Sequence, residues 1–546
     1  MKRFLYFLVV ILFISSCKER QEPVVFTKYN ETAALEKQQE HPNRRMKFKL
    51  FQSKYLDMNE VFKPFEEDLA YFSEEDYNAL KPMIIEQDIP TIQGHISKGH
   101  LNYEKLTLFY LYRIRKFESD STKSLNAIIA LNPNVVKEAK ELDKKYETVN
   151  PNSLHGMPIL LKDNINTNNM KTTAGAAVLK DNQTKEDAFI VKKLKENNAL
   201  ILGKLNLSEW AYFFCSGCPL GYSAVGGQTL NPYGRGEFET GGSSSGSGVA
   251  TAANYAVATV GTETSGSITS PSSMNSVVGL KPTIGVFSRT GIVPISSTLD
   301  TPGPMTKSVV DNAIFMNALR GYDEADAASV NVKDDYFRDG FTKNLSDFKL
   351  GVLKSLMNDS IYKMNVELIK SKGATVVELE PENPNFQGFI TLLNIDMKND
   401  LPEYFKSQAG PSIDQTGVAS VIEFNRKDTL MRAPYGQQLF EGIVKDETTQ
   451  EELEAIKERL KFAGQQYMAG LKAEGLDAVL SINNYHSGVA AVAKYPTLTV
   501  PMGYKESGEP ISLTFVGLPF SERKLLEVGY AFEKETKARK LPKNYE

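Results

Sequence analysis

The chain has 546 residues, of which 41% are hydrophobic and 24% charged, a composition typical of a globular protein and unlike that of a disordered chain. Its formal net charge is −4 and it contains no long basic run, which argues against nucleic acid as a partner. A chain of this length could hold two or three domains, although large α/β enzymes often keep a single core.

The N-terminal residues 1–16 predict a lipoprotein signal peptide. Lys2 and Arg3 precede about eleven apolar residues, FLYFLVVILFI, which are too few to span a membrane and suit the core of a signal peptide. The small residues before Cys17 resemble a bacterial lipobox, so we expect cleavage before Cys17 and lipidation of its thiol. This predicts a cell-envelope protein held at a membrane by a lipid anchor. The alternative is an ordinary secretory peptide with an incidental cysteine.

Residues 17–72 are predicted to form an N-terminal extension. The stretch up to about Arg45 is charged and poor in apolar residues, which is typical of a tether, whereas residues 46–72 mix aromatic and charged residues and are ambiguous. The main domain is expected over residues 73–546, and it begins with a helix whose predicted N-cap is Ser73.

Short apolar runs and helical patterns alternate through this domain, which predicts a layered α/β protein. Strands, some of them short pieces between Gly and Pro turns, are expected over residues 157–161, 199–203, 277–282, 291–295, 298–305, 477–482, 497–502 and 510–517. Helices are expected over residues 103–117, 134–146, 187–198 and 521–535, and another is expected to begin within residues 205–211. Residues 322–475 are more polar and predict a helical region with variable loops, followed by C-terminal core strands and a helix at 476–536.

The stretch Gly241–Ser273 is rich in glycine and serine. It opens on Gly-Gly-Ser-Ser-Ser-Gly, passes through a helical run of small residues and the apolar segment 256–260, and ends on a second Gly/Ser loop around Ser267. Glycine-rich loops let backbone N–H groups converge on a reacting atom. We therefore interpret this stretch as the active-site floor of a serine hydrolase.

A serine becomes nucleophilic when a neighbouring base takes its proton, and histidine is the usual base. Residues 242–246 match the G-x-S-x-G pattern, which requires a histidine downstream of the serine. Of the five histidines only His486 lies downstream, so an esterase that depends on His486 is one alternative. A phosphate-binding P-loop does not fit, because Ser247 stands where that motif requires a lysine.

Lysine is the other side chain that could serve as the base. Lys162 follows the apolar run Met157–Leu161, and lysine is rarely buried unless it is paired or used in chemistry. Its ordinary pKa of about 10.4 must fall to about 7–8 before it accepts a proton at neutral pH, and burial lowers the pKa of a lysine because it disfavours the ammonium form. The simpler interpretation is that Lys162 reaches solvent at the end of a strand.

Three motifs in this order resemble those of the amidase signature family: PILLKD at 158–163, GGSSSG at 241–246 and GTETSGSI at 261–268. Shorter matches are NLSEWA at 206–211, GGQT at 226–229, GLKPT at 279–283 and DTPGP at 300–304. The resemblance covers a signature core of about 154–307 and resumes at 495–536. The Gly-Thr-Glu-Thr form is similar to the peptide-amidase-like branch of the family.

The resemblance implies both a fold and a set of site residues. The fold is α/β, with a large mixed β-sheet covered by helices on both faces. Ser267 resembles the acyl-forming nucleophile, Ser243 a bridging serine preceded by a cis peptide bond, and Lys162 the base. A serine suits the middle place because its hydroxyl both donates and accepts a hydrogen bond. The predicted oxyanion hole consists of the backbone N–H groups of Thr264, Ser265, Gly266 and Ser267.

Several neighbouring residues are given supporting roles. Ser244 either orients the bridging serine or caps the following helix. Glu263 and Asp300 are expected to fix loops through hydrogen bonds rather than to act as acids or bases. Two positions depart from the pattern of many family members: Ser265 stands in place of a glycine before Gly266, and Thr269 in place of an arginine.

Two further cysteines, Cys215 and Cys218, form a C-S-G-C motif. In an exported protein this spacing suits a disulfide, a redox pair or two free thiols that line a loop. A zinc site is poorly supported, because the chain has no second CxxC motif and no nearby histidine.

These features together predict an amidase that needs no cofactor and no metal. Its substrate is expected to be a small-molecule or peptide carboxamide, split into a carboxylic acid and ammonia or an amine through a serine acyl-enzyme. A glutamine-dependent amidotransferase subunit and a non-catalytic envelope lipoprotein are two further functions that the sequence leaves open. Substrate-pocket residues are expected from the loops 176–183 and 215–223 and from the helical region after Tyr322.

Overall fold

The core strands meet in one eleven-stranded mixed sheet. The computed structural model describes residues 20–145, 149–337 and 339–546, so the predicted signal peptide and Cys17 lie outside the described residues. The strands are β1 (Ile128–Leu131), β2 (Pro158–Lys162), β3 (Leu200–Leu205), β4 (Tyr222–Ser223), β5 (Gly227–Gln228), β6 (Ala258–Glu263), β7 (Val278–Lys281), β8 (Thr301–Thr306), β9 (Lys349–Leu353), β10 (Thr375–Leu379), β11 (Ala478–Ile482), β12 (Thr497–Tyr504) and β13 (Pro510–Val516).

The sheet order is β1-β3-β2-β6-β8-β7-β12-β13-β11-β9-β10, while β4 and β5 pair separately. Strand β2 is parallel to both of its neighbours, β3 and β6, and β9 is parallel to β10 and β11. The remaining pairs in the large sheet are antiparallel. The sheet is therefore mixed, as predicted.

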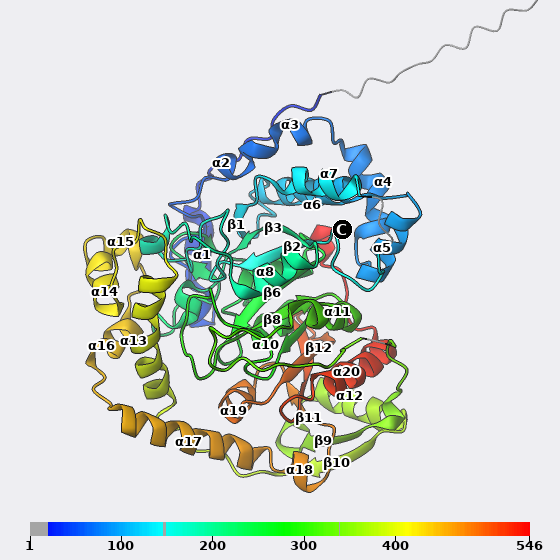
Figure 1. Cartoon of the computed structure of the whole chain (residues 1–546), viewed down its shortest axis with the longest axis vertical. Coiled ribbons are helices and arrows are strands. Elements are labelled where there is room, and N and C mark those ends of the chain that lie inside the picture. Colours follow the sequence, from blue (N-terminus) through cyan, green and yellow to red (C-terminus); the bar gives the residue numbers. More distant parts are fainter. Residues whose placement is uncertain (1–19, 146–148, 338) are drawn as a thin grey trace, which may run out of the picture.

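Helices surround this sheet (Figure 1). In the described residues they are α1 (Thr32–Gln39), α2 (Met58–Phe62), α3 (Glu66–Leu69), α4 (Glu74–Ile84), α5 (Ile89–Ser97), α6 (Tyr103–Glu118), α7 (Val135–Asp143), α8 (Phe189–Glu196), α9 (Ser245–Ala252), α10 (Thr269–Met274), α11 (Val309–Leu319), α12 (Ser360–Ser371), α13 (Phe389–Ser407), α14 (Val418–Arg426), α15 (Thr429–Arg432), α16 (Gln438–Lys445), α17 (Gln450–Tyr467), α18 (Gly470–Ala473), α19 (Ser487–Ala493) and α20 (Glu522–Thr536).

Strand β12 shows that helices cover both faces of the sheet. Gly529 of α20 packs against Leu498, whereas Thr269 of α10 lies 3.4 Å, hydroxyl to hydroxyl, from Thr497. Successive side chains of a strand point to opposite faces, so α20 and α10 lie on opposite sides of the sheet. The predicted α/β fold with a sheet covered on both faces is confirmed.

Two sequence-based expectations about single elements are wrong. The expected helix within residues 205–211 is instead a short turn at Glu209–Tyr212, in which Trp210 and Ala211 have φ angles of 51° and 52°. The N–H of Trp210 donates to the carbonyl of Ala174 (3.0 Å), so this turn is tied to another loop. The expected strand at 291–295 is reduced to one isolated bridge, between Ile165 and Ile292.

The region 322–475 is not purely helical, because it contributes β9 and the edge strand β10. Its helices α13–α16 gather at one side of the sheet (yellow in Figure 1). There they bury a second hydrophobic cluster that includes Leu401, Phe440 and Leu453. Trp210 of the core belongs to the same cluster, so this helical group is packed onto the core.

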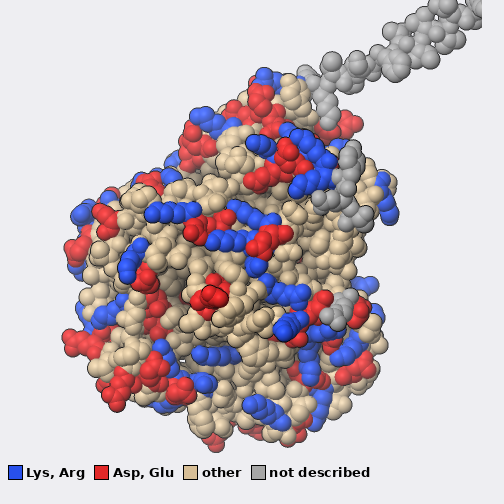
Figure 2. Space-filling model, viewed as in Figure 1, with Lys and Arg blue, Asp and Glu red and all other residues tan. Residues whose placement is uncertain are grey.

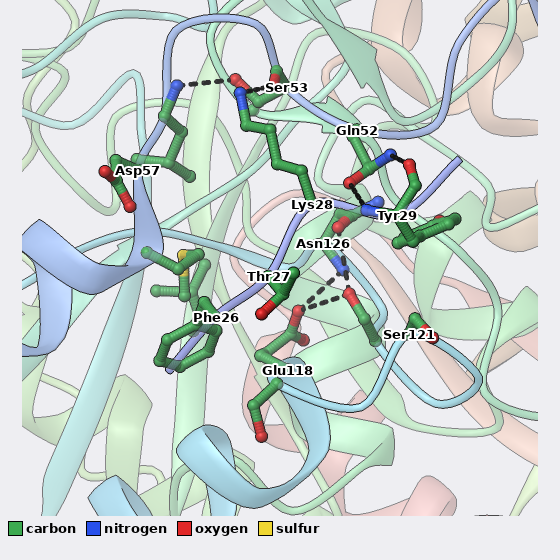
Figure 3. Close-up of a pocket in the computed structure, with 16 residues that line it drawn as sticks. Phe26, Thr27, Lys28, Tyr29, Gln52, Ser53, Asp57, Glu118, Ser121 and Asn126 are labelled. Carbon is green, nitrogen blue, oxygen red and sulfur yellow. Dashed lines mark hydrogen bonds between the residues drawn. The ribbon is translucent and has the colours of Figure 1, made fainter. Parts of the chain in front are cut away.

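The described part of the predicted N-terminal extension is packed against the body of the molecule. Phe48, Phe51 and Phe65 are buried in the main hydrophobic core, and the segment 26–29 crosses the pocket drawn in Figure 3. There Gln52 Nε2 donates to the carbonyl of Tyr29 (2.7 Å). A flexible tether would leave such groups in solvent, so residues 20–72 are, in this structure, part of the folded body.

Charged side chains of both signs are interspersed over the face drawn in Figure 2, with no continuous basic field among the described residues of that face. Within the described ranges, no helix is both long enough and apolar enough to cross a membrane.

Candidate active site

Strand β2 carries Lys162 into the interior of the protein. All five residues of the strand are buried, and Lys162 has no exposed surface, so the interpretation that it reaches solvent is wrong. Its Nζ lies 2.8 Å from Ser243 Oγ and donates to the carbonyl and the hydroxyl of Thr262, at 3.1 and 2.8 Å. Burial lowers the pKa of Lys162 to about 7. The amine is therefore a base that is partly uncharged at neutral pH.

Ser243 and Ser244 stand at the turn that leads into α9. The peptide bond between Gly242 and Ser243 is cis, as the family resemblance implies. Ser244 Oγ donates to the carbonyl of Thr262 (3.0 Å) and accepts its N–H (3.2 Å), and it does not cap α9. A Cβ on Gly261 would lie only 2.8 Å from Ser244 Oγ, so a glycine in β6 permits this close approach.

Ser267 lies on the loop between β6 and α10, where its exposed fraction is 9%. Within the described residues, the N–H groups of residues 264–267 donate no hydrogen bond. Gly266 has a φ of 91°, a conformation that favours glycine. The loop thus presents unpaired backbone donors, which is the property an oxyanion hole requires.

The loops of the two serines are joined through the backbone: the N–H of Ser244 donates to the carbonyl of Ser267 (3.1 Å). Among the described residues, no hydrogen bond links Ser243 Oγ to Ser267 Oγ. A serine hydroxyl moves by rotation about χ1 while its backbone stays in place. The contact between the two hydroxyls is therefore the part of the arrangement that depends on side-chain rotation.

Two carboxylates hold the loops around the site, as predicted. Glu263 Oε2 accepts the N–H groups of Ile268 and Thr269, at 2.8 and 2.9 Å, and the hydroxyl of Thr269 (3.0 Å). Asp300 accepts the hydroxyl of Thr264 (2.5 Å). Neither carboxylate contacts Lys162, but the negative charge of each opposes the fall in the pKa of that lysine.

The roles of Thr262 and Asn164 were not predicted from the sequence. Thr262 binds Lys162 through both its hydroxyl and its carbonyl, and Asn164 Nδ2 donates to the same hydroxyl (3.0 Å). Thr262 belongs to a recognised motif and Asn164 follows Lys162 by two positions, which is the only local signal for either.

His486 is engaged elsewhere. Its Nδ1 lies 2.6 Å from Ser481 Oγ and its Nε2 lies 2.9 Å from the hydroxyl of Tyr467. Burial lowers its pKa to about 4. Both ring nitrogens are therefore occupied away from Ser243 and Ser267, and the geometry offers no support for a histidine-dependent esterase.

Cys215 and Cys218 form a disulfide in the structure, which is one of the three states that their spacing suits. The hydroxyl of Tyr212 donates to the carbonyl of Cys218 (2.8 Å). The ring of Phe214 packs edge-on against Phe440 of α16, with centroids 5.1 Å apart. The disulfide loop thus lies against the helical group.

A cavity of about 390 Å³ adjoins the site between the core and α13. On the core side it is lined by Asn164, Thr262, Thr264 and residues 289–297, and on the helix side by Asp400, Glu403 and Tyr404. The expected contribution from the helical region after Tyr322 is present, whereas neither 176–183 nor 215–223 lines this cavity.

Comparison with known proteins agrees with this site. Residues 105–481 match the Amidase family, so the chain belongs to the amidase family. It is 34% identical over 480 residues to a probable amidase of Arabidopsis thaliana, covering 84% of this chain and 92% of that protein.

Two crystal structures are similar as well. An amidase family protein from Bacillus anthracis shares 36% identity, with 90% of this chain and 100% of that chain covered and a TM-score of 0.84. The peptide amidase from Stenotrophomonas maltophilia shares 36% identity, with 84% and 98% covered and a TM-score of 0.77. The protein is accordingly an amidase, a hydrolase that acts on carbon–nitrogen bonds.

Proposed function

We propose that this amidase hydrolyses carboxamides through an acyl-enzyme on Ser267, with Ser243 as the proton bridge and Lys162 as the base. The observation that carries the proposal is the position of Lys162 Nζ, fully buried and 2.8 Å from Ser243 Oγ. A lysine that has no solvent-exposed surface and a pKa of about 7 suits general-base catalysis near neutral pH.

The proposed reaction has two stages. Lys162 takes the proton of Ser243, which takes that of Ser267, and Ser267 Oγ forms a bond to the amide carbon. The N–H groups of residues 264–267 hold the resulting oxyanion, and a single such donor is typically worth about 3–4 kcal/mol. When the C–N bond breaks, the proton returns through Ser243 to the leaving nitrogen. A water molecule then loses its proton through the same relay and attacks the acyl carbon. The bond to Ser267 Oγ breaks, Ser267 regains its proton, and the acid is released.

A C-terminal peptide amide is the substrate class favoured by the likeness to a peptide amidase at 36% identity. In this reaction the leaving group is ammonia, so every recognised part of the substrate lies on the acyl side. The alternative, an amidotransferase subunit, would deliver its ammonia to a partner instead of releasing it.

Labelling with a fluorophosphonate tests the nucleophile. We expect the wild type to be modified at Ser267, by mass spectrometry of the peptide, and to hydrolyse a panel of amides. Ser267→Ala abolishes both, while Ser507→Ala in a surface turn keeps both. Labelling at another serine, or turnover that survives in Ser267→Ala, contradicts the proposal.

The histidine and the ammonia product test the two rival functions. We expect His486→Ala to retain amide hydrolysis, because both ring nitrogens already have partners outside the site. We also expect the purified chain alone to release free ammonia from a peptide amide. Loss of activity in His486→Ala at unchanged stability would favour the esterase, and ammonia release only with a partner protein would favour the amidotransferase.

We also propose that the protein is an exported lipoprotein anchored at Cys17. The support is the basic start, the apolar run and the small residues before Cys17. Cys17→Ala should move the protein from the membrane fraction to the soluble fraction of the envelope. Unchanged membrane fractionation of Cys17→Ala contradicts lipidation.

A further inference from the structure

The cavity beside the catalytic residues has an uneven distribution of charge. Arg289 is the one cationic side chain among its described lining residues, and its Nε donates to Asp326 Oδ2 (2.9 Å). This ion pair neutralises both partners. In Figure 2 acidic side chains border the hollow between the region of α13 and the core.

Two carboxylates of α13, those of Asp400 and Glu403, line the cavity. Asp400 accepts the N–H of Ser297 (2.6 Å) and forms no ion pair within the described residues. Burial, reinforced by the neighbouring carboxylates, raises the pKa of Asp400 to about 6, so it is mostly charged at pH 7. Glu403 is exposed and forms a solvent-exposed ion pair with Lys406 at 3.8 Å, a distance too long for a hydrogen bond.

An unpaired acceptor lies on the opposite wall. Asn164 is 98% buried, since its exposed fraction is 2%. Its Nδ2 donates to the hydroxyl of Thr262 (3.0 Å), but its Oδ1 has no partner. Buried polar atoms in native proteins are almost always hydrogen-bonded, so this oxygen lacks a donor that a ligand in the cavity could supply.

Away from the loop at Thr264, three groups on the two walls can therefore accept a hydrogen bond from a ligand: Asp400, Glu403 and Asn164 Oδ1. Two other polar groups of the cavity already have partners: Tyr404 donates to Asn166 Oδ1 (2.9 Å), and Asp300 accepts the N–H of Ser296 (2.9 Å). A ligand that fits this wall carries N–H donors and a positive charge.

We propose that this cavity binds a cationic group of the substrate, an ammonium or a guanidinium, and that the enzyme prefers amides whose acyl part carries such a group. This specificity rests on the proposed function, because it assumes that the acyl part extends from Ser267 past Thr264. Asp400 and Glu403 would meet the charge, and Asn164 Oδ1 would accept one N–H. Charge-assisted hydrogen bonds of this kind are the stronger ones.

Two series of substrates test the preference: acetyl-alanyl-X-amide and acetyl-X-alanyl-amide, with X being lysine, norleucine or glutamate. The three side chains are of similar length and differ in charge. In at least one series we expect kcat/KM for lysine to exceed that for norleucine by about ten- to a hundredfold, with glutamate the poorest.

The variants Asp400→Asn, Glu403→Gln and their combination keep the shape of the cavity and remove its charge. We expect the ratio of lysine to norleucine to fall with each and to approach one in the double variant. Glu367→Gln, an exposed change on α12, is the matched control and keeps the wild-type ratio. Equal rates for all three charges in both series, or an undiminished ratio in the double variant, overturns the proposal.

The same peptides are also measured as ligands of Ser267→Ala by calorimetry, so that preference is read without turnover. We expect the lysine peptide to bind more tightly than the norleucine peptide, and equal binding overturns the proposal. Hydrolysis without charge preference leaves the serine mechanism intact. Turnover that persists in Ser267→Ala refutes the mechanism itself, and the two failures are therefore distinguishable.

Discussion

Two fully buried lysines lie on neighbouring parallel strands, and their surroundings differ in one respect. Lys162 ends β2 and Lys204 lies in β3, where it pairs with Leu161. Lys204 Nζ is 3.1 Å from Asp163 Oδ1 and donates to the hydroxyl of Thr172 (2.9 Å). In the described residues Lys162 has no ion pair, and its partners are hydroxyls and a carbonyl.

The difference follows from the alternation of side chains along a strand. Asp163 is the next residue after Lys162, and successive side chains point in opposite directions. The carboxylate of Asp163 therefore pairs with Lys204 and not with Lys162. A carboxylate in contact favours the ammonium, whereas hydroxyls carry no charge to offset burial. Lys204 is thus part of a structural pair, and Lys162 is left free for the proposed role of base. Four experiments test this contrast.

The largest expected effect is on catalysis. Lys162→Ala should lower kcat/KM for a peptide amide by about 10²–10⁴-fold, because a positioned base contributes about that much. Steady-state kinetics at pH 8 measure it, with the exposed Lys505→Ala as control. A loss below tenfold would mean that another group takes the proton of Ser243.

The next effect is on stability. Lys204→Met leaves Asp163 buried without its cation, and removal of one partner of a buried pair typically costs about 3–5 kcal/mol of unfolding free energy. Denaturant unfolding measures it. Combining Lys204→Met with Asp163→Asn should recover much of the loss, because the uncompensated charge is gone. A single variant as stable as the wild type would show that the pair does not matter.

Replacing the unpaired Lys162 is expected to have the opposite effect on stability. The folded protein holds the pKa of Lys162 at about 7 instead of 10.5, so the unfolded chain binds more protons between these values. Lys162→Met removes that penalty and should stabilise the protein by about 1–3 kcal/mol, less than the full linkage energy because Ser243 loses a partner. The gain should be largest below pH 7 and shrink as the pH rises toward 10.5. Destabilisation at every pH contradicts this expectation.

The smallest effect is a shift of the pH profile. Activity should fall as the pH drops through about 7, because Lys162 becomes protonated. The negative charge of Asp300 raises the pKa of Lys162, so Asp300→Asn should move this acid limb to lower pH by about one unit or less. The pH dependence of kcat/KM measures it, and a shift to higher pH would exclude this influence.

The fold was predictable where strands are covered on both faces. Such strands read as continuous apolar runs, and β2, β3, β11, β12 and β13 all fall within or beside the predicted ranges. The edge strand β10 is mostly half-exposed and includes Glu378, so its sequence has no such run. The left-handed backbone at Trp210 was not predictable either, because it depends on a distant loop at Ala174.

The site was predictable where its residues lie in contiguous motifs. Lys162 and Ser243 each carry a local signature, and the structure brings them together. The role of Thr262 depends on β6 lying beside β2, and the pairing of Asp163 with Lys204 depends on the neighbour on the other side. Contacts across a sheet have no fixed spacing in the sequence, so no single motif reveals them.

The folded N-terminal segment has a consequence for the proposed lipid anchor at Cys17. The N–H of Gln21 already donates to the carbonyl of Ala70 (2.7 Å), and Cys17 precedes Arg20 by three residues. Three residues reach at most about 11 Å, so acyl chains on Cys17 would hold the folded body of the enzyme close to the membrane surface. Val25 and Tyr71, exposed at 69% and 50%, would then stand close to the lipid headgroups. Such an anchor would set the orientation of the enzyme on the bilayer as well as its location in the cell.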